Sequence, residues 1–262
     1  MQQIRQPAVA GLFYPADPGI LVSMIDGFLA KFPQVKAKPL KAIIVPHAGY
    51  IYSGPVAAAA YRHLEPLRDS ISRVVLLGPS HRVGFAGLAV SSADMFHTPL
   101  GDIPLDRPLC EKLATLPQVV RLDQAHVMEH SLEVQLPFLQ RVLDVFALVP
   151  LVVGEATADE VAEVLEAAWG GDETLIVISS DLSHYHSYSE AQRMDSTTCR
   201  AIESLKPESI FYEGACGRNP VMGLLQVARR KGLTAHTLDL RNSGDTAGSR
   251  DSVVGYGAWS FN

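Results

Sequence analysis

The strongest constraint on the fold is a short apolar run at residues 42–45 that is followed, after one proline, by His47. Its β-branched residues are typical of a strand buried on both faces of a sheet. Two later apolar runs repeat the arrangement and carry His81 and His184 just beyond their ends. Ligands of open α/β sheets bind beyond the carboxyl ends of parallel strands. We therefore expect three histidines to meet at one edge of one sheet.

Strand-like and helix-like segments alternate along the chain. Strands are expected at 42–45, 74–77, 86–91, 118–122, 145–153, 174–180, 234–240 and 252–261. Helices are expected over 18–31, 56–64, 105–116, 157–168, 189–205 and 220–231. This alternation predicts a single α/β domain over residues 1–262, with a mostly parallel mixed sheet flanked by helices on both faces.

Two helix starts carry local signals. Ser53 and Pro55 are typical of the N-cap and first turn of the helix expected over 56–64. Ser131 is a second candidate cap, and Pro137 should kink or interrupt the helix that follows it.

Composition narrows the class of protein. The chain has 262 residues, 47% of them hydrophobic, and a net charge of −6, which gives no reason to expect nucleic acid or an anionic membrane as a partner. No signal peptide and no membrane span is evident in the sequence. Three scattered cysteines then indicate reduced thiols and a cytoplasmic location.

Five of the nine histidines lie at a strand end or a helix start: His47, His81, His130, His184 and His186. Two neutral imidazoles with one carboxylate form the ligand set of non-haem ferrous sites, and they suit a catalytic zinc equally well. Taken singly, each histidine is explained as a capping or core residue; together they favour a site.

Acidic residues accompany these histidines. Asp181 precedes His184 by three positions, where it is expected to orient an imidazole or to cap the next turn. His184 itself is a candidate general base. Glu129, His130 and Glu133 are expected to form a polar wall of the same pocket, with a helix capping box as the alternative for Glu133.

Several signatures are missing. The chain has no Gly-x-Ser-x-Gly elbow, no Walker loop, no Gly-x-Gly-x-x-Gly, no His-Glu-x-x-His and no Cys-x-x-Cys. Serine hydrolases, nucleotide-binding proteins and classical zinc peptidases are therefore poorly supported.

The ordered motifs resemble those of the Memo family. They lie at residues 46–54, 77–81, 129–133, 179–184 and 216–218, and the stretches 242–245 and 253–258 fit the same family. The resemblance implies a fold similar to class III extradiol dioxygenases, which use ferrous iron to open catechol-type rings. Bacterial and archaeal members are known as the B component of a system (AmmeMemoRadiSam) paired with an AMMECR-like protein and a radical-SAM protein, which are thus the expected protein partners.

The resemblance also implies roles for individual residues. His47 and His81 match the two histidine ligands, and His184 matches the base of the dioxygenases. Animal members place a cysteine in the final loop, at the position of Thr246 here. The neighbouring Asp245 is our expected third ligand, as a carboxylate. Two further residues are ranked below it, first Glu133 and then Cys216, whose thiol is alternatively part of the pocket wall. The remaining residues expected to line the pocket are Tyr52, Glu129, His130, His186 and Thr246.

Three functions compete. The first is a mononuclear non-haem enzyme that uses Fe²⁺ and oxygen on a small, phenolic or otherwise oxidisable substrate, with Zn²⁺ or Cu as alternative metals. The second is a non-catalytic module that binds a peptide, a metabolite or a metal. The third is a zinc-dependent hydrolase in which His184 or Glu133 activates water.

Overall fold

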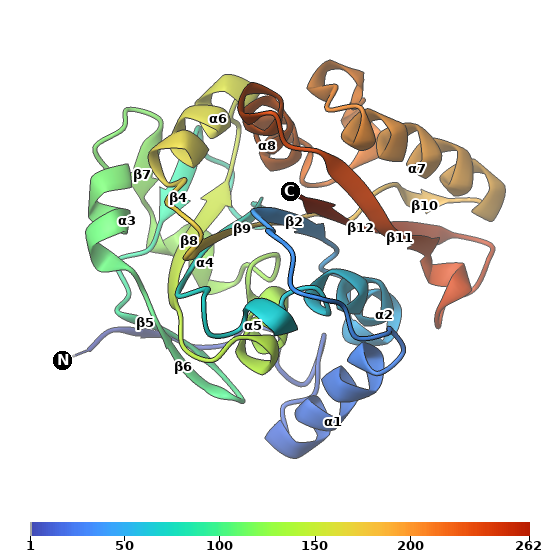
Figure 1. Cartoon of the computed structure of the whole chain (residues 1–262), viewed down its shortest axis with the longest axis horizontal. Helices are drawn as coiled ribbons and strands as arrows, with labels where there is room; N and C mark the ends of the chain where they lie inside the picture. Colours follow the sequence, from blue (N-terminus) through green and yellow to red (C-terminus); the bar gives the residue numbers. More distant parts are fainter. Residues whose placement is uncertain (1) are drawn as a thin grey trace.

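The centre of the molecule is a nine-stranded mixed sheet, seen in a computed structural model that describes residues 2–262 (Figure 1). Its strands are β2 (Ala42–Val45), β3 (Arg73–Pro79), β4 (Leu88–Val90), β7 (Val119–Arg121), β8 (Ala147–Val153), β9 (Thr174–Ser179), β10 (His184–His186), β11 (Ala235–Asn242) and β12 (Val253–Phe261). Their order across the sheet is β10-β12-β2-β9-β3-β8-β4-β7, and β11 pairs with β12. The predicted α/β class and mixed sheet are confirmed.

Parallel pairing is concentrated in the middle of the sheet. β2, β9, β3 and β8 are parallel neighbours, whereas β12 runs antiparallel to β2 and β4 runs antiparallel to β8. Because β2, β9 and β3 are adjacent and point the same way, the segments that follow them leave the sheet at one edge. His47 and His81 therefore start from neighbouring positions, whereas His184 lies on β10, at the edge of the sheet.

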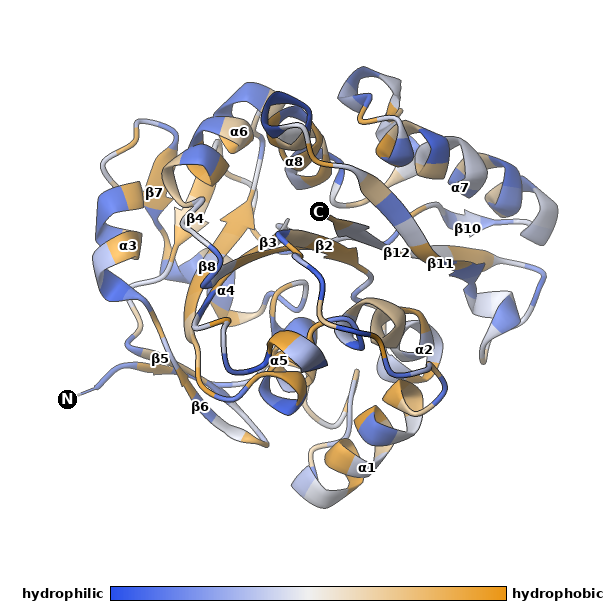
Figure 2. Cartoon of the chain, in the orientation of Figure 1, coloured by the Kyte–Doolittle hydropathy of each residue, from blue (hydrophilic) through white to orange (hydrophobic). Residues whose placement is uncertain are grey.

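Helices cover both faces of this sheet. They are α1 (Pro18–Leu29), α2 (Tyr50–Tyr61), α3 (Arg107–Leu113), α4 (Asp123–Val127), α5 (Leu136–Val142), α6 (Ala158–Ala167), α7 (Tyr188–Glu203) and α8 (Arg218–Lys231). The first hydrophobic core joins α1, α2 and α5 to one face, and the second joins α3, α6, α7 and α8 to the other (Figure 1). Successive residues of β2 alternate between the two cores, with Ile43 in the first and Ile44 in the second. Apolar residues accordingly run the length of the central strands (Figure 2).

Two local expectations have different outcomes. The predicted cap at Ser53 is wrong, because α2 already begins at Tyr50, and the Ser53 hydroxyl donates to the Ala48 carbonyl at 2.7 Å. The earlier start buries Tyr50, whose hydroxyl donates to the Val134 carbonyl, so packing overrides the local signal. Pro137 does interrupt the chain as expected: a 3₁₀ turn at Glu133–Gln135 ends there, and α5 starts with the proline in its first turn.

A second, small sheet ties down the amino-terminal segment and was not predicted. It consists of β1 (Ile4–Arg5), β5 (Met95–Thr98) and β6 (Gly101–Pro104). None of the helices within residues 2–262 has the length and apolar character needed to cross a membrane.

A buried ion pair between Arg5 and Glu133 anchors this segment to the main domain. The Glu133 carboxylate also accepts the backbone N–H groups of Ala8 at 2.7 Å and Val9 at 2.9 Å and the Tyr14 hydroxyl at 2.7 Å. Its oxygens are thus occupied by the amino-terminal segment, and it makes no capping bond to its own helical turn. Glu133 is therefore a structural residue here, and neither the pocket-wall role nor the capping box describes it.

The first prediction concerns this ion pair. Glu133→Ala should lower the free energy of unfolding by about 3–5 kcal/mol, because it leaves the Arg5 guanidinium buried without a counter-charge. Urea denaturation would measure the loss. The control is Asp69→Ala at an exposed position, which should change stability by less than about 0.5 kcal/mol. Equal stability of the two variants would contradict the anchoring role.

Candidate metal centre

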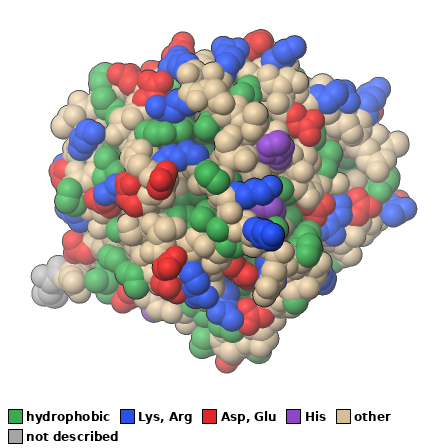
Figure 3. Space-filling view, in the orientation of Figure 1, with side chains coloured by type: hydrophobic (Ala, Val, Ile, Leu, Met, Phe, Trp, Pro, Cys, Tyr) green, Lys and Arg blue, Asp and Glu red, His purple; other side chains and the backbone are tan. Residues whose placement is uncertain are grey.

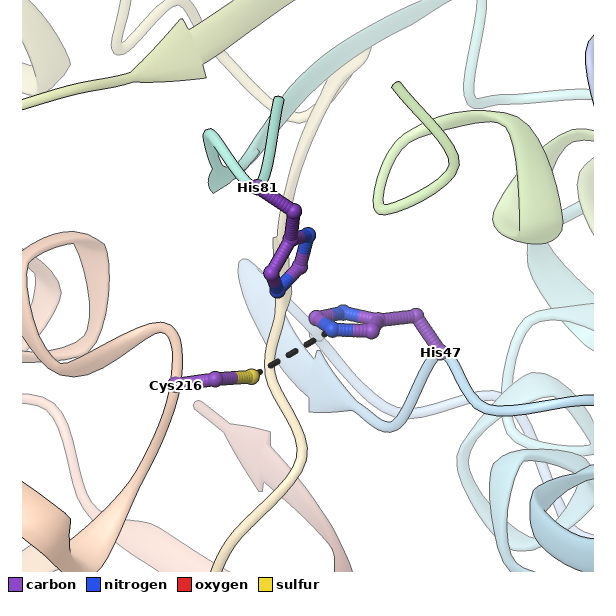
Figure 4. A group of neighbouring side chains, drawn as sticks. All are labelled: His47, His81 and Cys216. Carbon is purple, nitrogen blue, oxygen red and sulfur yellow. Dashed lines mark hydrogen bonds between the residues drawn. The ribbon is translucent and has the colours of Figure 1, made fainter. Parts of the chain in front are cut away.

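Three possible metal ligands converge beyond the carboxyl ends of β2 and β3. His47 and His81 follow these strands, and their ring centroids lie 5.3 Å apart in an edge-to-face arrangement. Cys216, in the loop before α8, places its Sγ 3.3 Å from Nε2 of His47 (Figure 4). The nearest ligand atoms of the three side chains all lie within 4.8 Å of one another. Three chain segments far apart in sequence therefore present donor atoms to one point.

The hydrogen bonds of Ser179 determine which nitrogen of His47 carries the proton. The Ser179 hydroxyl donates to the Ser131 carbonyl at 2.6 Å and accepts a hydrogen bond from the Gln135 amide at 2.8 Å. With its one proton used, Ser179 must also accept from Nδ1 of His47, which lies 2.9 Å away. The Nε2 lone pair of His47 is then free and faces Cys216, as metal ligation requires.

Burial, with smaller contributions from the charges of His81 and His130, holds the pKa of His47 well below its usual range. His47 is therefore neutral, which is the form that binds metals.

Glu129 orients the ring of His81 by a contact to Nδ1, as Ser179 orients the ring of His47. One carboxylate oxygen lies 2.9 Å from Nδ1 of His81, and the other accepts its backbone N–H at 2.6 Å. Burial acts to raise the pKa of Glu129, but the hydrogen bonds and charge of His81 and the N–H of Ser131 outweigh it and hold the pKa at about 2. The ionised carboxylate accepts a hydrogen bond from Nδ1–H of His81, so Nε2 is the ring nitrogen that faces away from Glu129. A carboxylate behind a ligating histidine is the common second layer of metal sites.

Cys216 reaches the histidines because its loop packs closely on the end of β9. Its backbone N–H donates to the Asp181 carbonyl at 3.2 Å, and its Sγ accepts the Asp181 N–H at 3.3 Å. A Cβ at Gly217 would lie 2.8 Å from the Ser179 carbonyl oxygen, so only glycine fits this approach. Burial raises the pKa of the Cys216 thiol, and the Asp181 carboxylate adds to the effect. The thiol therefore retains its proton in the folded protein, and its Sγ faces Nε2 of His47.

Asp181 and His184 add polar groups beside the three ligands. The buried Asp181 carboxylate accepts the backbone N–H of His47 at 2.7 Å, and its other oxygen lies 4.0 Å from Nε2 of His47. Burial raises the pKa of this carboxyl. Nδ1 of His184 donates to the Leu182 carbonyl at 2.8 Å, which leaves Nε2 of His184 as an available base. Tyr185, next in the chain, has a φ of 60°, an unfavourable conformation that typically costs about 1–2 kcal/mol and is found near functional sites.

Nearly the whole chain is similar to one known protein family. A family model described as Memo-like protein matches residues 5–260. The chain belongs to the Memo family. A MEMO1 family protein of Aquifex aeolicus is 39% identical over 265 residues, covering 97% of both chains. MEMO1 family proteins of Sulfolobus acidocaldarius and Methanocaldococcus jannaschii are 36% and 35% identical, with 97% and 98% of each chain covered.

The third ligand expected from the Memo resemblance, Asp245, is not brought to the histidines. Its carboxylate accepts the Tyr188 hydroxyl at 2.6 Å and the Asn242 N–H at 3.2 Å, and so caps the short turn at Ser243–Asp245. The hydroxyl of Thr246 donates to the Ser243 carbonyl in the same turn. Within residues 2–262, neither joins the group of converging ligand atoms. Cys216, ranked last from the sequence, is the residue that does.

The remaining predicted pocket residues surround the centre unevenly. His130 stacks on His81 with ring centroids 4.6 Å apart, and Nδ1 of His130 lies 3.3 Å from the Glu129 carboxylate. Tyr52 lies on α2 with 37% of its surface exposed. His186 is half-buried on β10, and its charge acts on Asp195 of α7. Sequence reasoning missed Ser179 and Gln135; Ser179 belongs to the motif at 179–184, but nothing local distinguishes Gln135.

Asp195 supports the segment that carries His184. It is buried on α7, and its carboxylate accepts the backbone N–H of Ser183 at 3.0 Å. A Cβ at Gly255 would collide with this carboxylate, so β12 carries glycine where it passes Asp195. Burial raises the pKa of Asp195 to about 6.

The second prediction concerns Glu129. Glu129→Gln should weaken metal retention by the protein roughly 10- to 100-fold. A neutral amide accepts a weaker hydrogen bond from Nδ1–H of His81 than the ionised carboxylate does, so the ring is oriented less firmly. Equilibrium dialysis against Zn²⁺ or Fe²⁺ would measure the change. Glu163→Gln on α6 keeps the same change of charge far from the site and should retain metal like the wild type. Wild-type affinity in the Glu129 variant would contradict the role of this carboxylate.

The third prediction is a pH dependence. The folded-state pKa of Asp195 exceeds its unfolded value, so ionisation from pH 4 to above pH 6 destabilises the fold by up to about 3 kcal/mol. Asp195→Asn, which still accepts the Ser183 N–H, should remove this loss. Urea denaturation at pH 4.5 and pH 7.5 should therefore show the variant gaining stability relative to the wild type at the higher pH. A difference that does not change with pH would refute the prediction, and Asp69→Asn serves as the exposed control.

Proposed function

We propose that this Memo family chain holds one non-haem metal ion on His47, His81 and Cys216 and uses it for an oxygen-dependent oxidation of a small substrate. The observation that carries the proposal is the convergence of one ring nitrogen from each of His47 and His81 and the Sγ of Cys216 within 4.8 Å of one another. Each ligand is fixed from behind, His47 by Ser179, His81 by Glu129 and Cys216 by the Asp181 backbone. Two imidazoles held in place and a thiol that can lose its proton fit a divalent transition metal.

Three protein ligands leave open positions for a substrate and for oxygen. Ferrous iron would supply redox chemistry and would polarise a bound hydroxyl group. The chain's own contribution is proton transfer: Nε2 of His184 accepts the proton of a bound phenolic or alcoholic hydroxyl, because Nδ1 is already committed to Leu182. Asp181, beside His47, supplies a buried carboxyl group on the same side.

A cleft of about 260 Å³ adjoins the centre and shares Cys216 as part of its wall. Phe85 and Pro220 give it apolar surface, and Ser80 and Asn219 give it hydrogen-bonding groups. This size and mixture suit a substrate no larger than about one substituted ring. The cleft supports a small molecule as the substrate.

A second function, zinc-dependent hydrolysis, is favoured by the thiol. Cysteine with histidine is a frequent zinc ligand set, whereas the dioxygenase-like set has a carboxylate as its third ligand. His184 would then take a proton from the attacking water. Cooperation with AMMECR-like and radical-SAM proteins stays a prediction from the family resemblance.

The fourth prediction tests the ligand set by elemental analysis of protein purified without oxygen. The wild type should carry close to one metal ion per chain, and His47→Ala, His81→Ala and Cys216→Ser should each lose most of it. Asp245→Ala is the matched control and should keep the metal, because its carboxylate caps a turn instead. Loss of metal in Asp245→Ala with retention in Cys216→Ser would reverse the assignment.

The metal identity and oxygen separate the functions. Iron, together with oxygen consumption when catechols or other phenols are added, would support the oxidative proposal. Zinc, with ester or amide hydrolysis that is unchanged without oxygen, would support the hydrolase. Protein that binds neither iron nor zinc would contradict the proposal and indicate a non-catalytic binding module.

A further inference from the structure

The opposite end of the sheet has a cleft that the metal centre does not use. This amino-end cleft has a volume of about 720 Å³ and is bordered by Lys41, which directly precedes β2. His47 follows the other end of the same strand, so the length of β2 separates the cleft from the metal centre. Clefts of roughly 300–1,000 Å³ are typical of sites for small organic molecules.

The walls of the amino-end cleft are mainly apolar. Leu40, Leu67 and Leu233 line it, together with the indole of Trp169, which lies just beyond α6. The parts of these side chains that face the cleft lose their contact with water when an apolar ligand covers them, which stabilises binding. The lining therefore indicates a ligand with an apolar or aromatic body.

Lysines are concentrated around this apolar surface. The Nζ atoms of Lys41 and Lys231 lie 5.2 Å and 4.9 Å from the ring centroid of Trp169. Lys41 is held in place, because its Nζ donates to the carbonyls of Gly171 at 2.7 Å and Thr174 at 2.8 Å. In the described part of the chain, residues 2–262, Lys231 and Lys38 form no ion pair. The ammonium groups of Lys231 and Lys38 are thus available to pair with an anionic ligand.

Acidic groups only partly balance these charges. Asp172 is in the cleft wall, and Glu173 pairs with Arg73 at 3.1 Å. Burial lowers the pKa of Lys41; Glu173 and Asp172 oppose that effect, and Lys231 adds to it. The two ammonium groups therefore repel each other across Trp169, and an anion bound to Lys231 would offset this repulsion.

A smaller cleft extends the same surface. It shares Lys38 and Leu40 with the amino-end cleft and adds Lys36, His63 and His236. Figure 3 shows Lys or Arg and His side chains gathered near the middle of the view, where Figure 1 places the C-terminus, with hydrophobic side chains beside them. Basic side chains thus adjoin apolar surface on one face of the molecule.

We propose that the amino-end cleft binds an amphipathic organic anion. The apolar body lies against Trp169 and the three leucines, and the anionic group pairs with Lys231 and Lys38. Carboxylates with a medium-length acyl chain or an aromatic ring match both requirements. This second site is independent of the proposed metal chemistry.

The fifth prediction uses tryptophan fluorescence of the whole chain. Trp169 lines the cleft and the only other tryptophan, Trp259, is fully buried in the core, so a ligand in the cleft should change the emission of Trp169 alone. Decanoate, added below its micelle-forming concentration, should give a saturable change with a Kd of roughly 1 mM or tighter. The change should disappear in Trp169→Phe. Decanol tests the need for charge, and acetate tests the need for an apolar body; both should bind at least roughly fivefold more weakly.

Lys38→Gln/Lys231→Gln should weaken decanoate binding roughly fivefold or more, because both free cations are removed. The control is Lys206→Gln at an exposed position outside the cleft, which should bind like the wild type. Metal content should be the same in all of these proteins. Absence of saturable binding, equal affinity for decanol, or unchanged affinity in the double variant would each overturn the proposal.

Discussion

The parallel pairing of β2, β9 and β3 is the constraint on which the site depends. Val45 pairs with Ser179 and Leu77 with Ile178, so these strands end almost level with one another. Their edges are saturated by hydrogen bonds and both faces are buried in the two cores, which leaves the register no freedom to slip. The loops that follow start a few ångströms apart, and a side chain two residues beyond each strand can reach a common point.

Buried hydrogen bonds then fix the orientation of the histidine rings. Ser179 and Gln135 orient His47, and Glu129 orients His81, so each ring keeps one bare nitrogen toward Cys216. In a region of low dielectric, an unpaired polar group is costly, and a fully paired network therefore selects one arrangement. The same need to pair buried polar groups explains the contacts of Glu133, whose partners all come from the amino-terminal segment. Glu133 lies close in sequence to residues of the site, but its carboxylate stabilises the fold by pairing with Arg5.

The two ends of the central strands differ in chemistry. The carboxyl end gathers two imidazoles and a thiol, which suits a metal ion and a small substrate. The amino end gathers lysines around Trp169 and half-buried leucines, which suits a larger organic anion. Under the two proposals, one sheet separates two kinds of ligand site by the length of its strands, and changes at one end should leave the other unaffected.

The sequence by itself determined the α/β class, most helix and strand positions, and the placement of His47 and His81 beyond strand ends, because apolar periodicity and strand-end position are local properties of the chain. Only the tertiary structure decided the third converging ligand. Asp245 and Glu133 are plausible carboxylates in the sequence, yet one caps a turn and the other pairs with Arg5, while Cys216 arrives from 169 residues beyond His47. The small sheet around β1 and the partners of Ser179 were equally hidden. Contacts between distant segments depend on which backbones pack together, and that packing is a property of the whole fold, which no stretch of sequence contains.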